Sequence, residues 1–250
     1  MIMSDQSFPQ NYFGSRTTNE VPSKEFLEKT LTRGKRPLVK FIQSLPDKAR
    51  VLDAGCGTAK GIKLIIAYRP DIEVIGLDIS QTERFIPQEI KFVRGSVEEA
   101  DKLFPADSFD AIICLHVLEH LAYPMKTITA FKKVLKNNGL LYLEVPNWPR
   151  LINPLSDKFF WNDYTHIRPF TKRAVARLME DFAFIVKEIK TMVSGSLIEG
   201  TDTVANAKKL YQEKAMTPAI FIKKALRMML MRLMNVMIRG IILAVAVNKK

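Results

Sequence analysis

The sequence predicts an α/β fold: a doubly wound, Rossmann-like sheet of seven mostly parallel strands with an antiparallel last strand. Short apolar runs alternate five times with helix-length segments, which is the pattern of a parallel sheet joined by crossover helices. A glycine-rich turn follows the first apolar run, and a β-branched run near the end of the chain predicts the antiparallel return strand. The predicted strands are 51–53, 73–79, 90–95, 109–115, 139–145, 184–191 and 241–247.

Helices are predicted between these strands from apolar residues at helical spacing and from capping residues such as Thr171. The predicted helices are 23–32, 37–45, 62–68, a short one ending at 104, 123–136, 171–182 and 218–239. We therefore expect a single domain over residues 1–250. Residues 1–45 would form an N-terminal helical cap segment, and residues 192–239 a basic helical insertion before the last strand.

Composition favours a cytoplasmic protein. The 250 residues are 47% hydrophobic, which is enough for a sizeable core. Two cysteines, Cys56 and Cys114, offer no disulfide framework and suit a reducing compartment. Residues 1–16 lack the regions of a signal peptide, and no stretch approaches the ~18 uninterrupted apolar residues of a membrane-spanning helix.

The positive charge is concentrated at one end of the chain. The formal net charge is +12, and residues 201–250 hold ten Lys and Arg against two acids, which gives +8 and leaves +4 for the first 200 residues. A nucleic-acid groove built across the whole body would need basic residues throughout. We therefore expect no nucleic-acid partner.

The glycine-rich turn after the first strand points to a ligand site. Such a turn puts backbone N–H groups at a helix N-terminus against a ligand, and Gly55 and Gly57 allow a sharp bend. A dinucleotide site has the pattern G-x-G-x-x-G. Its third glycine would fall on Lys60, and Gly61 is one place late. A nicotinamide-dependent oxidoreductase is therefore kept as the alternative.

An acid before the glycines favours a different cofactor. The spacing Asp53-x-Gly55-x-Gly57 resembles motif I of the class I S-adenosylmethionine-dependent methyltransferases, with Ala59 at the family's usual third glycine. The resemblance covers about residues 45–190 and the last strand. It is greatest to the type 11 and type 23 branch that includes quinone-biosynthesis enzymes. It implies S-adenosyl-L-methionine as the cofactor and transfer of its methyl group to an acceptor.

Two further stretches resemble the same family. Residues 116–121, which contain Leu118-Glu119-His120, are similar to its motif IV, and residues 163–171 to its histidine-to-phenylalanine-threonine stretch.

Further cofactor contacts are expected at the ends of strands two and three. Asp78 ends the second strand, where a carboxylate takes both ribose hydroxyls of a nucleotide. Family members commonly place an acid after the third strand for the adenine amino group, but this chain has Ser96, so we assign that contact to Ser96, Glu98 or a backbone group. The predicted cofactor-binding residues are Asp53, Ala54, Gly55, Cys56, Gly57, Asp78, Ile79, Ser96, Val97 and Leu115.

The three histidines of the chain follow predicted strands four and five. Ligands of open α/β sheets bind at these carboxyl ends, and the ordinary pKa of histidine, ~6.5, suits a general base. We predict His116, His120, His166 and Tyr164 as catalytic residues, in no order that the sequence fixes. The alternative for each histidine is a loop residue that only makes hydrogen bonds. No metal site is predicted, because no H-x-x-x-H pattern falls on a predicted helix and the cysteines do not form a cluster.

A long aromatic loop, 148–170, follows the fifth strand. Loops of this length are usually functional or disordered, and its aromatic residues favour a lid over the acceptor, the alternative being ordinary core packing. The family resemblance leaves a small molecule, a sugar or a lipid-linked compound as the acceptor. A non-catalytic, cofactor-binding module associated with a membrane is a further alternative.

The predicted helix 218–239 is amphipathic and basic. Its cationic residues share one half of the helix surface: Lys223, Lys224, Arg227, Arg232 and Arg239. The other half is apolar and includes Met229 and Met237, two of the five methionines of this helix. Three interpretations stay open: packing on the sheet, packing on a second subunit in a homodimer, and peripheral binding to an anionic membrane surface.

Overall fold

The computed structural model describes Val21 and residues 36–147, 163–192 and 241–250. The predicted helices 23–32 and 218–239 and most of the loop 148–170 lie outside the described residues. The described part contains the whole predicted sheet, so the fold can be compared with the expectation strand by strand.

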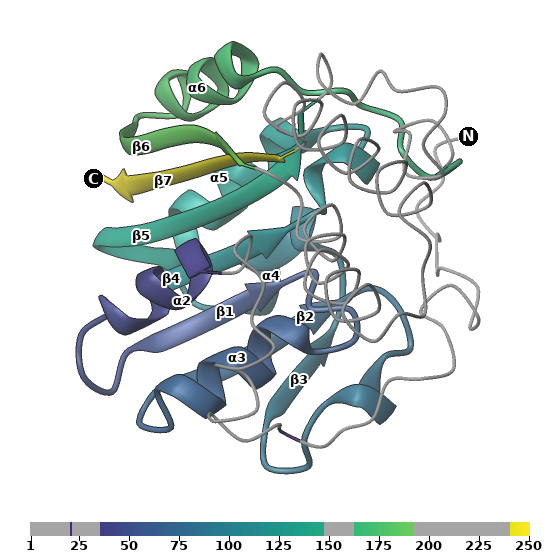
Figure 1. Cartoon of the computed structure of the whole chain (residues 1–250), viewed down its shortest axis with the longest axis vertical. Helices are drawn as coiled ribbons and strands as arrows, with labels where there is room; N and C mark the ends of the chain where they lie inside the picture. Colours follow the sequence, from purple (N-terminus) through teal and green to yellow (C-terminus); the bar gives the residue numbers. More distant parts are fainter. Residues whose placement is uncertain (1–20, 22–35, 148–162, 193–240) are drawn as a thin grey trace, which may run out of the picture.

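The seven strands form one sheet in the order β3-β2-β1-β4-β5-β7-β6 (Figure 1). Strands β1 to β5 pair in parallel, and β7 lies antiparallel between β5 and β6. The predicted fold class is therefore confirmed. The strands are β1 (Arg50–Ala54), β2 (Glu73–Asp78), β3 (Lys91–Arg94), β4 (Phe109–Leu115), β5 (Leu135–Pro146), β6 (Phe184–Met192) and β7 (Ile241–Asn248).

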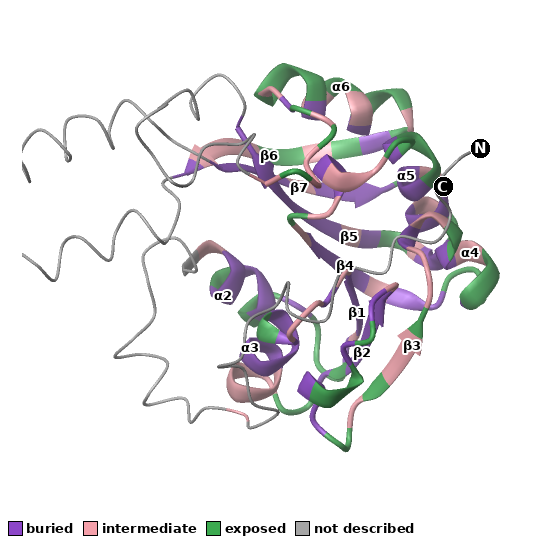
Figure 2. Ribbon diagram, turned by 90° about the vertical axis from the view of Figure 1, so that its right-hand side faces the viewer, coloured by how far each residue is buried: buried purple, intermediate pink, exposed green. Residues whose placement is uncertain are grey.

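Helices cover both faces of the sheet, as Figures 1 and 2 show. Helices α2 (Arg36–Gln43) and α3 (Lys60–Tyr68) lie on one face. The other face carries α4 (Ala100–Leu103), α5 (Pro124–Val134) and α6 (Lys172–Asp181). Three 3₁₀-helices lie in the connections: η1 (Glu83–Phe85), η2 (Val97–Glu99) and η3 (Leu118–His120).

The two faces of the sheet form two hydrophobic cores. Successive residues of a strand point to opposite faces, so Val51 and Ala111 pack with α2 and α3 while Leu52 and Ile112 pack with the helices opposite. All four are fully buried. Burial on both faces explains why the central strands are continuous apolar runs rather than alternating ones.

The predicted boundary between the helix 123–136 and the following strand was wrong. The helix predicted over 123–136 ends at Val134, and β5 begins at Leu135, so residues 135–138 belong to the strand and not to the helix end and turn. The Nδ2 of Asn248 donates to the carbonyl oxygens of Lys132, Leu135 and Lys136 at 3.0 to 3.2 Å. This amide satisfies the Lys132 carbonyl in the last turn of α5, where carbonyls lack partners within the helix, and two carbonyls at the start of β5.

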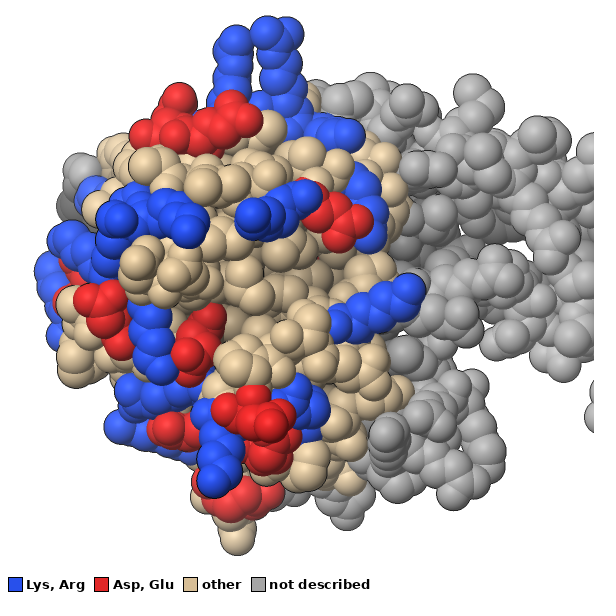
Figure 3. Space-filling view, turned by 90° about the vertical axis from the view of Figure 1, so that its left-hand side faces the viewer, with Lys and Arg blue, Asp and Glu red and all other residues tan. Residues whose placement is uncertain are grey.

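Charges of both signs alternate where the parallel strands begin. Figure 3 shows Lys and Arg interspersed with Asp and Glu on this face. Ion pairs here include Lys136 with Asp110 at 2.8 Å and Lys133 with Asp101 at 2.6 Å. Exposed pairs of this kind stabilise by at most ~1 kcal/mol each. Within the described ranges, no helix combines the length and apolar character needed to cross a membrane.

The connectivity places a ligand site at one edge of the sheet. From β1 the chain proceeds outward to β2 and β3, and then returns to the other side of β1 to begin β4. The turns after β1 and β4 therefore diverge, which opens a crevice at the carboxyl ends of these strands.

Candidate active site

A cleft of about 1420 Å³ opens at the carboxyl ends of β1, β2, β3 and β4. Ligand sites typically occupy ~300–1,000 Å³, so the cleft has room for a nucleoside-sized molecule and a second compound. Every site residue predicted from the sequence lines it except Ala54 and Tyr164. Ala54 is buried in the core, and Tyr164 is 77% exposed.

The turn after β1 requires its glycines. Gly55 and Gly57 have φ angles of 76° and 49°, in the left-handed region that favours glycine. A Cβ on Gly55 would lie 2.2 Å from Cγ2 of Val117, so a side chain there would displace the loop after β4. Ala59 also has a positive φ, 60°, which costs an L-residue roughly 1–2 kcal/mol. The position where the family usually has its third glycine therefore has a left-handed backbone conformation in this chain, at Ala59.

Gly61 has a separate role from the one that a dinucleotide pattern would give it. A Cβ on Gly61 would lie 2.4 Å from Oδ2 of Asp53. Asp53 ends β1 with only 2% of its surface exposed, and it lines the cleft. The glycine thus allows α3 to start directly against this carboxylate.

Asp78 connects the glycine turn to the end of β2. Its Oδ2 accepts a hydrogen bond from the backbone N–H of Gly57 and its Oδ1 from that of Ser80, both at 2.8 Å. The residue is 8% exposed and lines the cleft. The turn is therefore held open by a carboxylate that also faces the ligand space.

The end of β3 supplies further acceptors. Ser96 caps η2 by accepting a hydrogen bond from the N–H of Glu98 at 3.2 Å. The Glu98 Oε1 is buried and accepts no hydrogen bond from the described residues. Glu98 therefore joins Ser96 as a group available to a donor in the cleft.

The three histidines gather at the other end of the cleft. His116 follows β4 with a φ of 56°, and its N–H donates to the carbonyl oxygen of Glu144 at 2.9 Å. Its Nδ1 lies 3.4 Å from Oε1 of Glu119, and its Nε2 lies 3.9 Å from Oε2 of Glu144. Both acids are buried, with exposures of 0% and 1%. The Glu144 Oε1 accepts from the hydroxyl of Tyr142 at 2.6 Å.

The rings of His120 and His166 lie next to each other in a tilted arrangement, although they come from loops far apart in the sequence. Their ring centroids are 4.7 Å apart with an interplanar angle of 50°. The Nδ1 of His120 lies 3.2 Å from the carbonyl oxygen and 2.9 Å from the hydroxyl of Thr165. Burial lowers the pKa of His120, while the nearby Glu119 carboxylate raises it and His166 lowers it further. The net effect favours a neutral imidazole.

Two backbone hydrogen bonds hold these loops together. The carbonyl oxygen of Glu119 accepts from the N–H groups of Ile167 and Arg168, both at 3.0 Å. The Arg168 Nη2 also donates to the carbonyl of Ala122 at 2.8 Å. The loop after β4 and the loop before α6 are therefore one preassembled unit.

Comparison with known proteins decides the family. Residues 25–188 match the family model described as "Methyltransferase domain". The chain belongs to this family. Its resemblance to the class I S-adenosylmethionine-dependent methyltransferases is thus confirmed, with S-adenosyl-L-methionine as the family's cofactor, and the nicotinamide-dependent oxidoreductase is set aside.

Curated relatives of this methyltransferase match over its central part. The ubiquinone biosynthesis O-methyltransferase of Dechloromonas aromatica is 32% identical over 109 residues, which cover 39% of this chain and 44% of that protein. The malonyl-[acyl-carrier protein] O-methyltransferase of a Paenibacillus species is 29% identical over 101 residues, 37% of each. The matched segment therefore spans less than half the length of these relatives.

Solved structures share the methyltransferase fold over most of the chain. Phosphoethanolamine N-methyltransferase 2 of Haemonchus contortus, solved with S-adenosyl-L-methionine, has a TM-score of 0.61 and 16% identity. The match covers 86% of this chain and 52% of that one. An S-adenosylmethionine-dependent methyltransferase from Archaeoglobus fulgidus has a TM-score of 0.56 and 17% identity, with 90% and 94% covered. At these identities the likeness concerns the fold.

The cleft of this methyltransferase fits its cofactor. Gly55 lines the cleft and has no side chain, so the main chain can approach a ligand closely there. Asp78, the predicted partner of the ribose, and Glu98, one of the predicted partners of the adenine amino group, both line this cleft. The individual cofactor contacts remain predictions from the motif and this geometry.

Sequence reasoning missed one central side chain of the site. Glu119 was noticed only as part of the Leu118-Glu119-His120 run. Yet its carboxylate lies 3.4 Å from His116 and within 4.8 Å of a ring nitrogen of His120 and of His166. Asp163 and Thr165 were also missed, and both contact histidines. The sequence signal that could have identified Glu119 was its position beside His120 in the loop after a predicted strand.

Proposed function

We propose that the protein transfers the methyl group of S-adenosyl-L-methionine to a hydroxyl oxygen of a small-molecule, sugar or lipid-linked acceptor. The acceptor would lie at the histidine end of the cleft. The observation that carries this proposal is the position of His120, which lines the same cleft as the glycine turn. Burial lowers its pKa below the ordinary value, so that it is neutral and able to accept a proton near pH 7.

The cofactor supplies a methyl group on a positively charged sulfur. When bound beside the glycine turn and Asp78, this cofactor would supply its methyl group to the acceptor oxygen: a carbon–oxygen bond would form as the sulfur–carbon bond breaks. His120 takes the proton of the hydroxyl, and the electron pair of the broken bond stays on sulfur. Thr165 fixes the ring of His120 through Nδ1. Positioning of the two reactants supplies much of the rate enhancement in such reactions.

Two observations support an oxygen acceptor with an apolar part. Several of the relatives that match the chain are named O-methyltransferases. Tyr123, Met125 and Ile167 line the cleft and are exposed by 40%, 44% and 54%. Exposed apolar side chains beside a binding site favour apolar ligands.

Calorimetry and turnover test this proposal. Titration should show binding of S-adenosyl-L-methionine and none of NAD. Formation of S-adenosylhomocysteine is then measured over phenols, sugars and lipid-linked alcohols. His120→Gln should lower turnover by about 10²–10⁴-fold, the usual contribution of a general base, with cofactor affinity unchanged. Cofactor binding with no methylated product across the panel would instead favour a non-catalytic module.

A further inference from the structure

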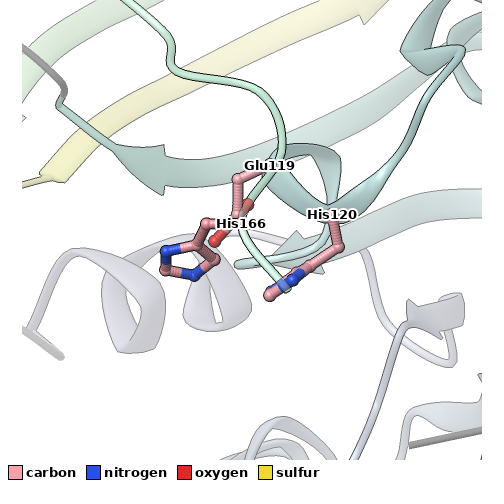
Figure 4. A group of neighbouring side chains, drawn as sticks. All are labelled: Glu119, His120 and His166. Atoms are coloured by element: carbon pink, nitrogen blue, oxygen red, sulfur yellow. The ribbon is translucent and has the colours of Figure 1, made fainter. Parts of the chain in front are cut away.

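We propose that Glu119, His120 and His166 bind a divalent transition-metal ion at the histidine end of the cleft. Each residue offers one ligand atom, and these atoms all lie within 4.8 Å of one another. Figure 4 shows the Glu119 carboxylate directed toward the two imidazole rings. Two imidazoles and one carboxylate form a donor set that suits Zn²⁺ and related ions and leaves coordination positions for further ligands.

The state of Glu119 is the main argument for a cation. Its side chain is fully buried, and neither carboxylate oxygen accepts a hydrogen bond from the described residues. Burial of an ionised carboxylate without compensation is strongly unfavourable. The Nδ1 of His116 at 3.4 Å is close but does not form a hydrogen bond with it. A metal ion held between Glu119 and the two other histidines would supply the missing positive charge.

The surroundings of the two histidines resemble an outer coordination shell. Metal-binding histidines usually direct the second ring nitrogen to a carbonyl or a carboxylate, which fixes the tautomer and the ring orientation. The Nδ1 of His120 faces the carbonyl oxygen and hydroxyl of Thr165. The Nε2 of His166 lies 3.7 Å from Oδ2 of Asp163. Asp163 in turn accepts hydrogen bonds from the N–H and hydroxyl of Thr165, at 3.0 and 2.5 Å.

The three ligands are brought together by the fold before any ion binds. The carbonyl oxygen of Glu119 accepts hydrogen bonds from the N–H groups of Ile167 and Arg168. The loop that carries His166 is therefore bonded to the residue that supplies the carboxylate. All three ligands also line the cleft. With the ion bound, His120 is a ligand and no longer the base. An acceptor oxygen placed on the ion would then lose its proton to water more readily, because a bound cation stabilises the oxyanion. This use of the ion rests on the proposed function, whereas binding of the ion does not.

Metal titration of the full chain without a histidine tag tests the site. The chain has only three histidines and two buried cysteines, so competing sites for soft metals are few among the described residues. The protein is treated with a chelator, dialysed and titrated with Zn²⁺ by calorimetry, and Co²⁺ is added separately to record its visible absorption. We expect one ion per chain.

Substitutions identify the ligands. Glu119→Gln and His166→Gln should each weaken Zn²⁺ binding by about 100-fold or more, because loss of even an outer-shell partner costs ~10–100-fold. His116→Gln is the matched control, since it removes a neighbouring histidine outside the triad and should retain the ion. Circular dichroism and S-adenosylhomocysteine binding check that each variant is folded.

The proposed site is wrong if the protein binds neither Zn²⁺ nor Co²⁺. It is also wrong if binding of these ions is unchanged in both Glu119→Gln and His166→Gln. The functional proposal fails separately: an ion that binds in a chain with no methyl transfer supports the site and refutes the proposed function. Methyl transfer by a chain that binds neither ion refutes the site and supports the function.

Discussion

At the scale of single residues, Asp78 fixes a loop and faces a ligand at the same time. Its two oxygens accept hydrogen bonds from the N–H groups of Gly57 and Ser80. An ionised carboxylate has about four lone-pair sites, so the same side chain can also accept from ribose hydroxyls. The acid that the sequence singled out therefore has a structural reason to be there in addition to the predicted binding role.

Substitution of Asp78 should weaken cofactor binding. Hydrogen bonds to a charged group contribute ~1.5–3 kcal/mol each, so Asp78→Asn is expected to lower the affinity for S-adenosyl-L-methionine by about tenfold or more in calorimetry. Glu73→Gln is the control, because Glu73 lies exposed at the start of the same strand, 3.1 Å from Arg50. Equal affinities of Asp78→Asn and the unmodified protein would remove Asp78 from the cofactor site.

Single residues also show where sequence reasoning reached its limit at the site. The glycine turn and the ends of the strands could be predicted because their signals are local. The role of Glu119 could not, because its burial and its position beside His166 depend on hydrogen bonds between loops more than 40 residues apart. The sequence search considered ligands at fixed spacing on one helix, whereas Glu119, His120 and His166 come from two loops.

At the scale of elements, the strands were predictable and one helix end was not. A central strand is buried on both faces, so its apolar run marks its length directly, as β4 illustrates with the predicted bounds 109–115. The end of α5 depends instead on Asn248, which lies 113 residues away from Leu135 in the chain. No pattern within residues 123–139 reveals this partner.

Removal of the Asn248 amide should destabilise the protein. The side chain is fully buried and donates to three carbonyl oxygens at the junction of α5 and β5. Buried carbonyls that lose their donor cost ~1–3 kcal/mol, so Asn248→Ala should lower the free energy of unfolding by about that amount in urea denaturation. The neighbouring Lys249→Ala removes only an exposed hydrogen bond to Asn138 and should change it by less than ~0.5 kcal/mol. Similar values for the two variants would contradict this role.

At the scale of the whole molecule, the topology explains why distant residues meet at one site. The chain changes direction between β1 and β4, and the cleft is lined by loops that follow β1, β2, β3, β4 and β5. The cofactor end and the histidine end therefore lie in one continuous space. Because the histidine end is partly buried, its protonation is coupled to the stability of the fold.

His120 is the group through which this coupling acts. Burial lowers the pKa of His120 in the folded protein, and the opposing effect of Glu119 is smaller. The unfolded chain keeps the ordinary pKa of about 6.5. As the pH falls below that value, the unfolded chain takes up this proton before the folded protein does. The free energy of unfolding should then decrease, until the pH falls through the lowered pKa of the folded state.

Urea denaturation across pH 5 to 8, with a chelator present, measures this dependence. His120→Gln removes the titrating group and leaves the other histidines in place. Above the unfolded pKa, the unmodified protein and the variant should show a constant difference in the free energy of unfolding. Below it, the unmodified protein should lose stability relative to the variant, because only its unfolded state gains the additional proton. A difference that stays constant over the whole range would show that His120 titrates alike in both states, and that its neutral form is not favoured by folding.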